Sequence, residues 1–225
     1  MPLSILRDIP LFAELNDEEL TKLAGCLQTK EYKKDSTVVS ETDEGSTLFI
    51  INKGQVKISR TSESKKEVIL AILGEGDFFG EMSLLDGLTR SANVITIKDS
   101  ELFLLRREDF LVLTEKNPQI AVGLLKELAF RLRKSDAQIK SLSLFDAAGR
   151  VATALIQIAE DTGTIKDGVV RIQNLPSQQD LANIAGTSRE TISRVLNAFI
   201  ADKLIKKSKG SLFINNYEKF KRRFS

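Results

Sequence analysis

The hydrophobic pattern of this chain changes period at Pro118, and that change restricts the fold more than any other feature of the sequence. From Pro118 to Ser143 the seam positions step alternately by four and three residues, which is the heptad repeat of a helix that packs against a partner helix. The pattern predicts one long helix over residues 118–144, with a seam of about three heptads. The seam comprises Ala121, Leu125, Leu128, Leu132, Ser135, Ile139 and Leu142.

The partner of this seam has two interpretations. A second copy of the chain could supply the facing helix, which makes residues 118–144 a candidate dimerisation helix, or the helix could pack on its own domain. Ser135 is the polar position of the seam. A polar residue there costs stability unless it fixes the register or meets a ligand.

Short strand-like runs precede the long helix. They are rich in β-branched residues and are separated by turn signals such as Asn52-Lys53-Gly54. This spacing predicts an antiparallel roll or barrel, preceded by a short amphipathic helix over Asp17–Leu27. The runs are residues 38–39, 48–51, 56–58, 68–73, 94–97 and 102–105.

Composition excludes several classes of function. The chain has no histidine and a single cysteine, Cys26, which rules out an intrachain disulfide, His-ligated metals and most hydrolase triads. We expect Cys26 to be a small buried hydrophobe, and we predict no enzymatic activity because no nucleophile is paired with a base. No apolar run approaches the roughly 18 to 20 residues of a bilayer span, and the charged amino terminus is unlike a signal peptide, so the expected location is the cytoplasm.

The net charge of +2 conceals an asymmetry along the chain. Residues 144–225 contain 13 Lys or Arg against 8 Asp or Glu, whereas the residues before them carry a net charge of −3. The carboxy-terminal part is therefore where contacts with a polyanion such as DNA are expected.

Two capped helices in this basic part predict a helix-turn-helix. Ser177 can cap the first helix with Asp180 at its third position, Gly186 makes the turn, and Thr187 or Ser188 caps the second helix. Polar side chains gather within about 140° on the second helix, opposite an apolar face. The polar set is Arg189, Glu190, Ser193, Arg194 and Asn197, and the apolar set is Ile192, Val195, Leu196 and Phe199.

The chemistry of this polar face suits the major groove of DNA. Arginine can bind guanine O6 and N7 with two hydrogen bonds, and glutamate can accept one from cytosine N4. Residues 204–214 alternate about a Lys-Gly turn, which predicts a β-hairpin wing with lysines facing phosphates. Solvated ion pairs on an ordinary surface are the alternative. The predicted DNA-binding residues are Ser177, Gln178, Ser188, Arg189, Glu190, Ser193, Arg194 and Lys209.

These patterns together predict an α+β fold for the 225 residues. The amino-terminal antiparallel β-roll spans residues 1–117, the long helix 118–144, and a carboxy-terminal winged helix-turn-helix 145–225. Phe145–Gly149 is the predicted interdomain hinge.

Residues 79–92, here called the cassette segment, have the composition of an anion site. Gly80 permits a close backbone approach, the residues after it can form a short helix, and Arg90 and Ser91 supply a cation and a hydroxyl donor. A phosphodiester suits this set, and Glu81 supplies the acceptor pair that holds a ribose hydroxyl. Each residue alone is better explained by a turn glycine or a surface ion pair.

The pattern Gly-Glu-x-Ser-Leu-Leu-(x4)-Arg-Ser-Ala resembles the phosphate-binding cassette of cyclic-nucleotide-binding domains. With the seam helix and Ser-Arg-Glu-Thr-Ile-Ser-Arg at residues 188–194, the chain is similar to the Crp/Fnr (catabolite activator) family of bacterial transcription regulators from about Leu6 to Ile214. The resemblance implies a homodimer that binds cAMP or cGMP as an allosteric ligand and a pseudo-palindromic operator in double-stranded DNA. RNA polymerase is the implied protein partner.

The resemblance also assigns roles within the ligand site. It implies that Glu81 holds the ribose 2′-hydroxyl and that Arg90 and Ser91 hold the cyclic phosphate, while Ser135 and Asp136 fall at the positions that reach the base. The implied ligand-binding residues are Gly80, Glu81, Met82, Ser83, Arg90, Ser91, Ala92, Ser135 and Asp136.

The chain departs from the family in three ways. It lacks the cysteine cluster of Fnr-type oxygen sensors and the histidine of haem-binding members, so neither an iron–sulfur cluster nor haem is expected. Ser135-Asp136 stands at the base-reading position, where the cAMP-responsive members of the family have a Thr-Ser-like pair. Asp136 could accept hydrogen bonds from the N1 and N2 donors of guanine and so favour cGMP, or it could be a solvated helix residue. Three further alternatives remain: a ligand-independent factor, a sensor of another small molecule such as a cyclic dinucleotide, and a nucleotide-sensing adaptor that binds protein.

Overall fold

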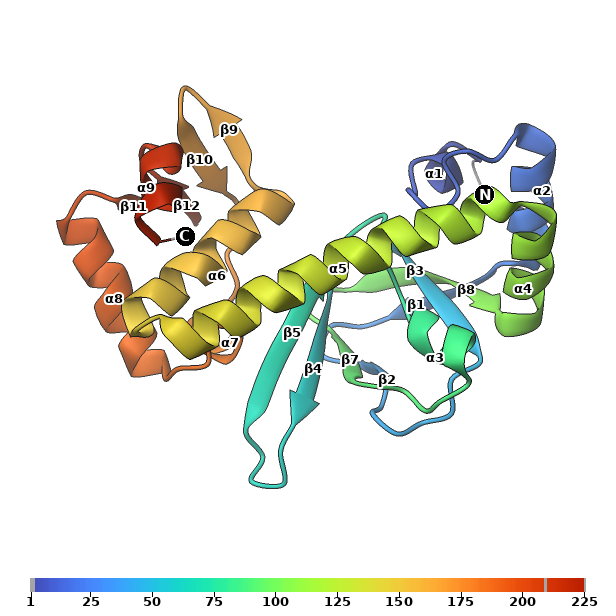
Figure 1. Cartoon of the computed structure of the whole chain (residues 1–225), viewed down its shortest axis with the longest axis horizontal. Coiled ribbons are helices and arrows are strands. Elements are labelled where there is room, and N and C mark those ends of the chain that lie inside the picture. Colours follow the sequence, from blue (N-terminus) through green and yellow to red (C-terminus); the bar gives the residue numbers. More distant parts are fainter. Residues whose placement is uncertain (1–2, 209, 225) are drawn as a thin grey trace. The chain divides into compact units, whose positions relative to one another are not determined.

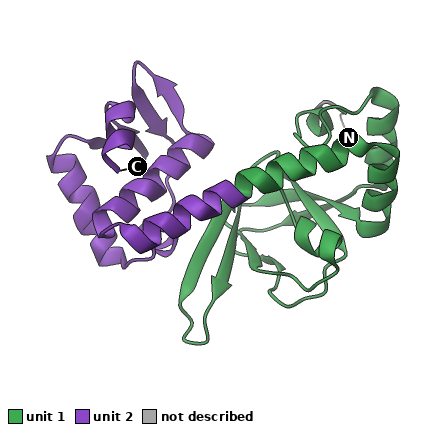
Figure 2. Cartoon of the chain, in the orientation of Figure 1, with its two compact units in different colours: residues 1–131 green, residues 132–225 purple. Residues whose placement is uncertain are grey.

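The computed structural model describes residues 3–208 and 210–224. The chain divides into two compact units, residues 1–131 and residues 132–225, and the division falls inside the long helix α5, Pro118–Leu144 (Figure 2). This helix has the predicted length. The domain boundaries inferred from the sequence stay a prediction.

The first unit is built on two four-stranded antiparallel sheets, with strand orders β1-β8-β3-β6 and β2-β7-β4-β5 (Figure 1). The strands are β1 (Gln28–Tyr32), β2 (Thr37–Val39), β3 (Thr47–Lys53), β4 (Val56–Thr61), β5 (Glu67–Leu73), β6 (Phe78–Phe79), β7 (Asn93–Thr96) and β8 (Ser100–Arg106). The six predicted runs correspond to β2, β3, β4, β5, β7 and β8, which confirms the antiparallel architecture. Sequence reasoning missed β1 because four of its five residues are exposed, so it has no hydrophobic alternation.

Over the described residues of the first unit, four short helices accompany the sheets: α1 (Leu3–Arg7), α2 (Asp17–Cys26), α3 (Glu81–Asp86) and α4 (Arg107–Lys116). Asn16 and Glu19 form a capping box at the start of α2. Ile120 and Leu124 of α5 are buried in the same core as α2 and α4. Cys26 is exposed, contrary to expectation, because α2 ends there, beyond the buried Leu23.

The second unit contains the predicted helix-turn-helix and hairpin. Its elements are the end of α5, α6 (Ala147–Thr162), β9 (Thr164–Lys166), β10 (Val169–Ile172), α7 (Gln178–Ala185), α8 (Arg189–Ala201), β11 (Ile205–Ser208), β12 (Ser211–Ile214) and α9 (Tyr217–Phe224). The four strands form one antiparallel sheet in the order β11-β12-β10-β9. The sequence did not predict α9.

The segment expected to be a hinge is mostly helical. Asp146 caps α6 by accepting a hydrogen bond from the amide of Gly149 at 2.8 Å, so residues 147–149 form the first turn of the helix. Only Phe145 and Asp146 lie between α5 and α6, and both flanking helix ends belong to the second unit. Among the described residues, no helix is both long and apolar enough to cross a membrane.

Candidate functional site

The cassette segment begins at a glycine that the local geometry requires. Gly80 precedes α3 with a φ of 86°, in the left-handed region that favours glycine. A Cβ at this position would lie 2.5 Å from Nη1 of Arg90 and 2.9 Å from the carbonyl oxygen of Thr47. The absence of a side chain at Gly80 therefore allows the Arg90 guanidinium to approach the backbone.

Arg90 is held from inside the fold by backbone carbonyls. Its Nη1 donates to the Gly80 oxygen at 2.9 Å and its Nη2 to the Thr47 oxygen at 2.8 Å, and the residue is 6% exposed. A guanidinium has five N–H donors, so these two bonds fix its position while leaving others for an anion. Burial lowers the pKa of Arg90, and the charges of Glu81 and Asp43 oppose that shift. Arginine nevertheless stays protonated in proteins, so the site holds a buried positive charge.

Glu81, the first residue of α3, forms an ion pair with a residue that sequence reasoning missed. Its Oε1 accepts from Nη1 of Arg131 at 3.1 Å, and its side chain is 7% exposed. Arg131, on α5, also donates to the Phe78 carbonyl at 2.8 Å and to Glu127 at 2.8 Å. The i, i+4 spacing of Glu127 and Arg131 is visible in the sequence, but nothing local indicates that this arginine reaches Glu81.

The other predicted residues of the cassette segment lie in different environments. Ser83 is buried, and its hydroxyl donates to the Thr89 carbonyl at 3.5 Å. Ser91 is exposed, with its hydroxyl 3.7 Å from the sulfur of the half-exposed Met82, and Ala92 is buried. The structure thus brings Gly80 and Glu81 close to the buried guanidinium of Arg90. Ser91 and Met82 lie at the adjoining surface.

Gly45 is a second residue that sequence reasoning missed. A Cβ there would lie 2.3 Å from the Ser83 Cβ and 3.0 Å from Nε of Arg90, so the loop before β3 lies directly against the cassette segment. Its only sequence signal is the turn pattern Asp43-Glu44-Gly45.

Ser135 and Asp136 are both exposed on the part of α5 that belongs to the second unit. Their contact with a base stays a prediction. The positions of the α5 seam differ in exposure: Leu128 packs on the core of the first unit, whereas Leu125, Leu132 and Ile139 are 66%, 63% and 62% exposed. Helix packing on its own domain therefore accounts for only part of the seam.

The second unit presents the predicted polar face of α8 to solvent. Ser188 caps the helix by accepting from the Thr191 amide at 3.2 Å. Arg189, Glu190 and Arg194 are exposed and Ser193 is partly buried. The opposite face is buried in the core of the unit: Ile192, Val195, Leu196 and Phe199. Hydrogen bonds from its own amide and the Ser188 hydroxyl lower the pKa of Glu190, so this carboxylate is charged at neutral pH.

The first helix of the pair and the wing complete this surface. The exposed Ser177 caps α7 by accepting from the Asp180 amide at 3.1 Å, and Gln178 is the partly buried first residue of α7. Gly186 ends α7 with a φ of 59°, as the turn requires. The predicted contact residue Lys209 lies outside the described residues.

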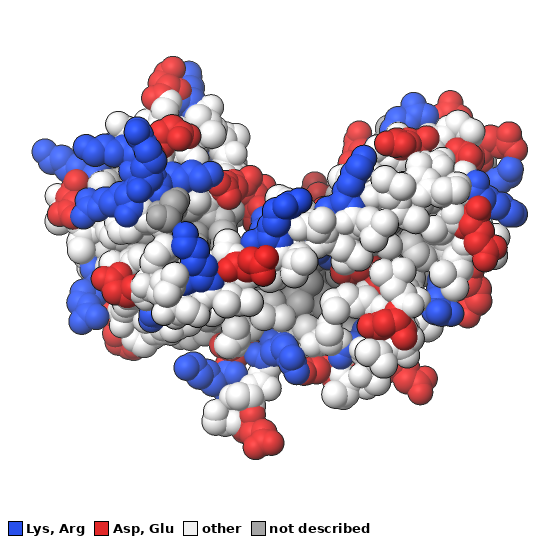
Figure 3. Space-filling view, viewed as in Figure 1, with Lys and Arg blue, Asp and Glu red and all other residues white. Residues whose placement is uncertain are grey.

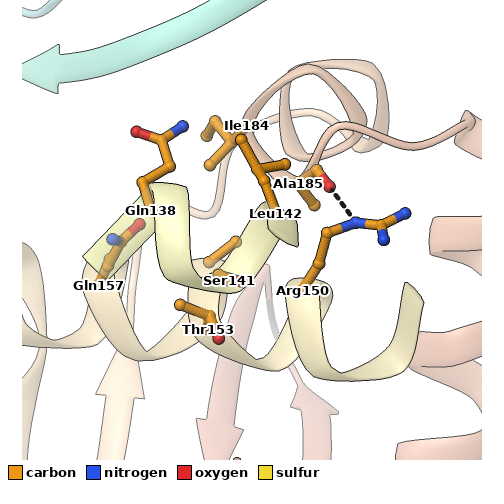
Figure 4. Close-up of a pocket in the computed structure, with 9 residues that line it drawn as sticks. Gln138, Ser141, Leu142, Arg150, Thr153, Gln157, Ile184 and Ala185 are labelled. Carbon is orange, nitrogen blue, oxygen red and sulfur yellow. Dashed lines mark hydrogen bonds between the residues drawn. The ribbon is translucent and has the colours of Figure 1, made fainter. Parts of the chain in front are cut away.

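Arg150 links the end of α7 to the residue that follows α5 (Figure 4). Arg150, on α6, donates from Nε to the Ala185 carbonyl of α7 at 3.0 Å and from Nη1 to the Phe145 carbonyl at 3.1 Å. The cleft beside it, lined by Gln138, Ser141 and other residues of α5, α6 and α7, has a volume of about 10 Å³. This space holds no more than one water molecule, so the cleft is a packing contact and not a ligand site.

Comparisons with known proteins support the assignment of both regions. Sequence models of two protein families match the chain, the cyclic nucleotide-binding domain at residues 29–117 and the Crp-like helix-turn-helix domain at residues 149–223. The chain is 36% identical over 207 residues to a protein named Cyclic AMP receptor protein from Thermus thermophilus, covering 92% of this chain and 93% of that protein. It is 32% identical over 219 residues to the CRP-like cAMP-activated global transcriptional regulator of Mycobacterium tuberculosis, covering 97% and 98%.

Solved structures are similar over most of the chain. The Thermus thermophilus catabolite activator protein matches with 35% identity and a TM-score of 0.55, covering 95% of this chain and 97% of that one. FixK2 from Bradyrhizobium japonicum matches with 21% identity and a TM-score of 0.77, covering 88% and 98%, and this likeness concerns the fold alone.

Proposed function

Because the chain belongs to the Crp/Fnr family of transcription regulators, we propose that it is a homodimer in which a cyclic nucleotide, bound in the first unit, controls recognition of a pseudo-palindromic operator by the second. The observation that carries the proposal is the pairing of two features in one chain. These are the buried Arg90 with donors left for an anion, and a helix-turn-helix with an exposed polar face.

The ligand site is supported by the chemistry of the cassette segment. The Arg90 guanidinium would bind the cyclic phosphate with the N–H groups that the Gly80 and Thr47 carbonyls do not use. Ser91 would add a hydroxyl donor. Glu81 would accept from the ribose 2′-hydroxyl, and its ion pair with Arg131 orients its carboxylate for that bond.

We propose cAMP as the ligand. The two relatives compared above carry names that refer to cAMP, and Asp136 is exposed, as a solvated helix residue would be. Calorimetric titration should therefore give tighter binding of cAMP than of cGMP. Tighter binding of cGMP, converted to a cAMP preference by Asp136→Ser, would contradict this choice and assign base recognition to Asp136.

The dimer is supported by the exposed part of the α5 seam. Leu125, Leu132 and Ile139 are apolar, more than half exposed and spaced as the heptad repeat requires. A two-fold dimer would present two copies of α8 to two half-sites about one helical turn of DNA apart, roughly 34 Å. Since a transcription regulator acts on RNA polymerase, we propose that enzyme as its protein partner.

Substitutions on α8 test the DNA-binding part of the proposal. Duplexes should first be selected from a random pool with the cAMP-bound protein. Arg189→Ala and Arg194→Ala should each weaken binding to the selected duplex by about 5- to 150-fold, the loss of about 1–3 kcal/mol expected when an arginine leaves a base pair. Binding to unrelated DNA should change far less. Fluorescence anisotropy measures both affinities.

Lys34→Ala is the matched control, because Lys34 is an exposed cation of the first unit. It should leave the affinity for the selected duplex unchanged. If both arginine variants also bind that duplex as the wild type does, α8 is not the reading helix.

A further inference from the structure

The carboxy-terminal helix α9 has two faces of opposite character. Tyr217 and Phe220 are buried and Phe224 is partly buried in the core of the second unit. The ring centroids of Phe220 and Phe224 lie 5.7 Å and 5.4 Å from that of Phe199 on α8. The aromatic face therefore docks α9 on the back of the recognition helix, where it is not available to a partner.

The opposite face of α9 is basic. Lys219, Arg222 and Arg223 are exposed and fall within an arc of about 100° on a helical projection. Among the described residues, none of the three forms an ion pair with a carboxylate, whereas their neighbour Lys221 pairs with Glu160 of α6. One cation of the helix thus anchors it, and three are left facing solvent.

These three cations continue a basic surface that begins in the turn before β11 and runs along that strand. Lys203, Lys206 and Lys207 are exposed and likewise lack a carboxylate partner among the residues that the structure describes. Figure 3 shows Lys and Arg side chains gathered over the part of the second unit where Figure 1 places α9 and β11. We call the set of Lys203, Lys206, Lys207, Lys219, Arg222 and Arg223 the basic flank.

The chemistry of the basic flank selects its partner. A membrane surface is disfavoured, because an interfacial helix needs its apolar face for the lipid and the apolar face of α9 is buried in the protein. A polyanion is favoured, since guanidinium groups bind phosphates with two parallel hydrogen bonds and unpaired cations release counterions when they meet a nucleic acid. The proposed binding of α8 to a duplex would bring DNA to the same unit, so DNA is the polyanion that we choose as the partner of the basic flank.

We propose that the basic flank binds backbone phosphates of the operator outside the turn read by α8, and so lengthens the DNA segment that each protomer covers. This inference rests on the DNA-binding function proposed above. The α9 cations add affinity without adding sequence information, because phosphates are the same at every base pair.

Salt dependence of binding tests the inference. The selected operator is prepared in two lengths, one of about 20 base pairs that covers two half-sites and one of about 40 that adds flanking DNA on both sides. Binding of full-length protein with cAMP is measured by anisotropy over a range of salt concentrations. The slope of log K against log salt is negative, with a magnitude of about 0.9 for each phosphate that the protein neutralises. On the long duplex, the variant Lys219→Gln/Arg222→Gln/Arg223→Gln should reduce this magnitude by up to about 3 per protomer, because three cations are removed. On the short duplex the slope should stay that of the wild type.

Lys34→Gln/Lys98→Gln/Lys116→Gln is the matched control, since it removes the same charge from exposed positions of the first unit. It should leave both slopes unchanged, and thermal unfolding should show that α9 remains docked in the α9 variant. An unchanged slope on the long duplex would overturn the inference and leave an acidic protein as the partner of this surface. An equal fall on both duplexes would overturn the placement outside the central turns. Failure of the wild type to bind either duplex would instead remove the proposed function itself.

Discussion

Arg90→Ala is expected to abolish the response to cyclic nucleotide. The guanidinium is buried and held by two carbonyl groups, so its removal takes away the buried cation of the cassette segment that we propose as the partner of the cyclic phosphate. Loss of one partner from a buried, hydrogen-bonded charge pair costs about 2–5 kcal/mol, which weakens nucleotide binding by about 30-fold to several thousand-fold. Calorimetric titration with cAMP measures the loss.

The structural role of Arg90 must be separated from its role in binding. Without it, the Gly80 and Thr47 carbonyls lose their donors, which costs about 1–3 kcal/mol of stability. The midpoint temperature of thermal unfolding, measured without ligand, should therefore decrease modestly. Weak, salt-sensitive binding to unrelated DNA should persist because the second unit is intact. A variant that binds cAMP and responds to it as the wild type does would show that the cassette segment is not the ligand site.

Leu125→Glu/Leu132→Glu is expected to convert the protein into a monomer. Both leucines are more than 60% exposed within one chain, so the substitutions leave the cores of the protomer untouched. A wild-type dimer through the seam would bury four leucines, two from each protomer, and each would contribute about 1.5–3 kcal/mol. The variant would place four carboxylates at these buried positions. The dimer dissociation constant should therefore rise by at least about a thousandfold, as measured by sedimentation equilibrium.

Val112→Glu on α4 is the control for this experiment. Val112 is 49% exposed but lies outside the seam, so this variant should associate as the wild type does. The affinity of Leu125→Glu/Leu132→Glu for the operator should also fall when its dimer dissociates, because a single recognition helix contacts one half-site. If Leu125→Glu/Leu132→Glu still sediments as a dimer, the partner helix of the seam is not a second α5.

Local sequence signals predicted most of the elements. Ser177, Gly186 and Ser188 each perform the capping or turn role that their residue type favours, because capping is decided within three or four residues. The length of α5 followed from its heptad period in the same way. Among the elements that were missed, two carry no such signal: β1 is almost wholly exposed, and the eight-residue α9 is too short for its pattern to be distinctive.

The sequence by itself determined which residue types stand in the cassette segment and on α8, because these motifs are contiguous and their spacing fits one turn or one helix face. Only the tertiary structure decided what holds them. It placed Thr47 and Gly80 around the Arg90 guanidinium, brought Arg131 of α5 to Glu81, and docked α9 so that its cations face solvent. The partners in these contacts are mostly distant along the chain, and they meet only because burial of the two cores brings their elements together. No local period or cap encodes that meeting.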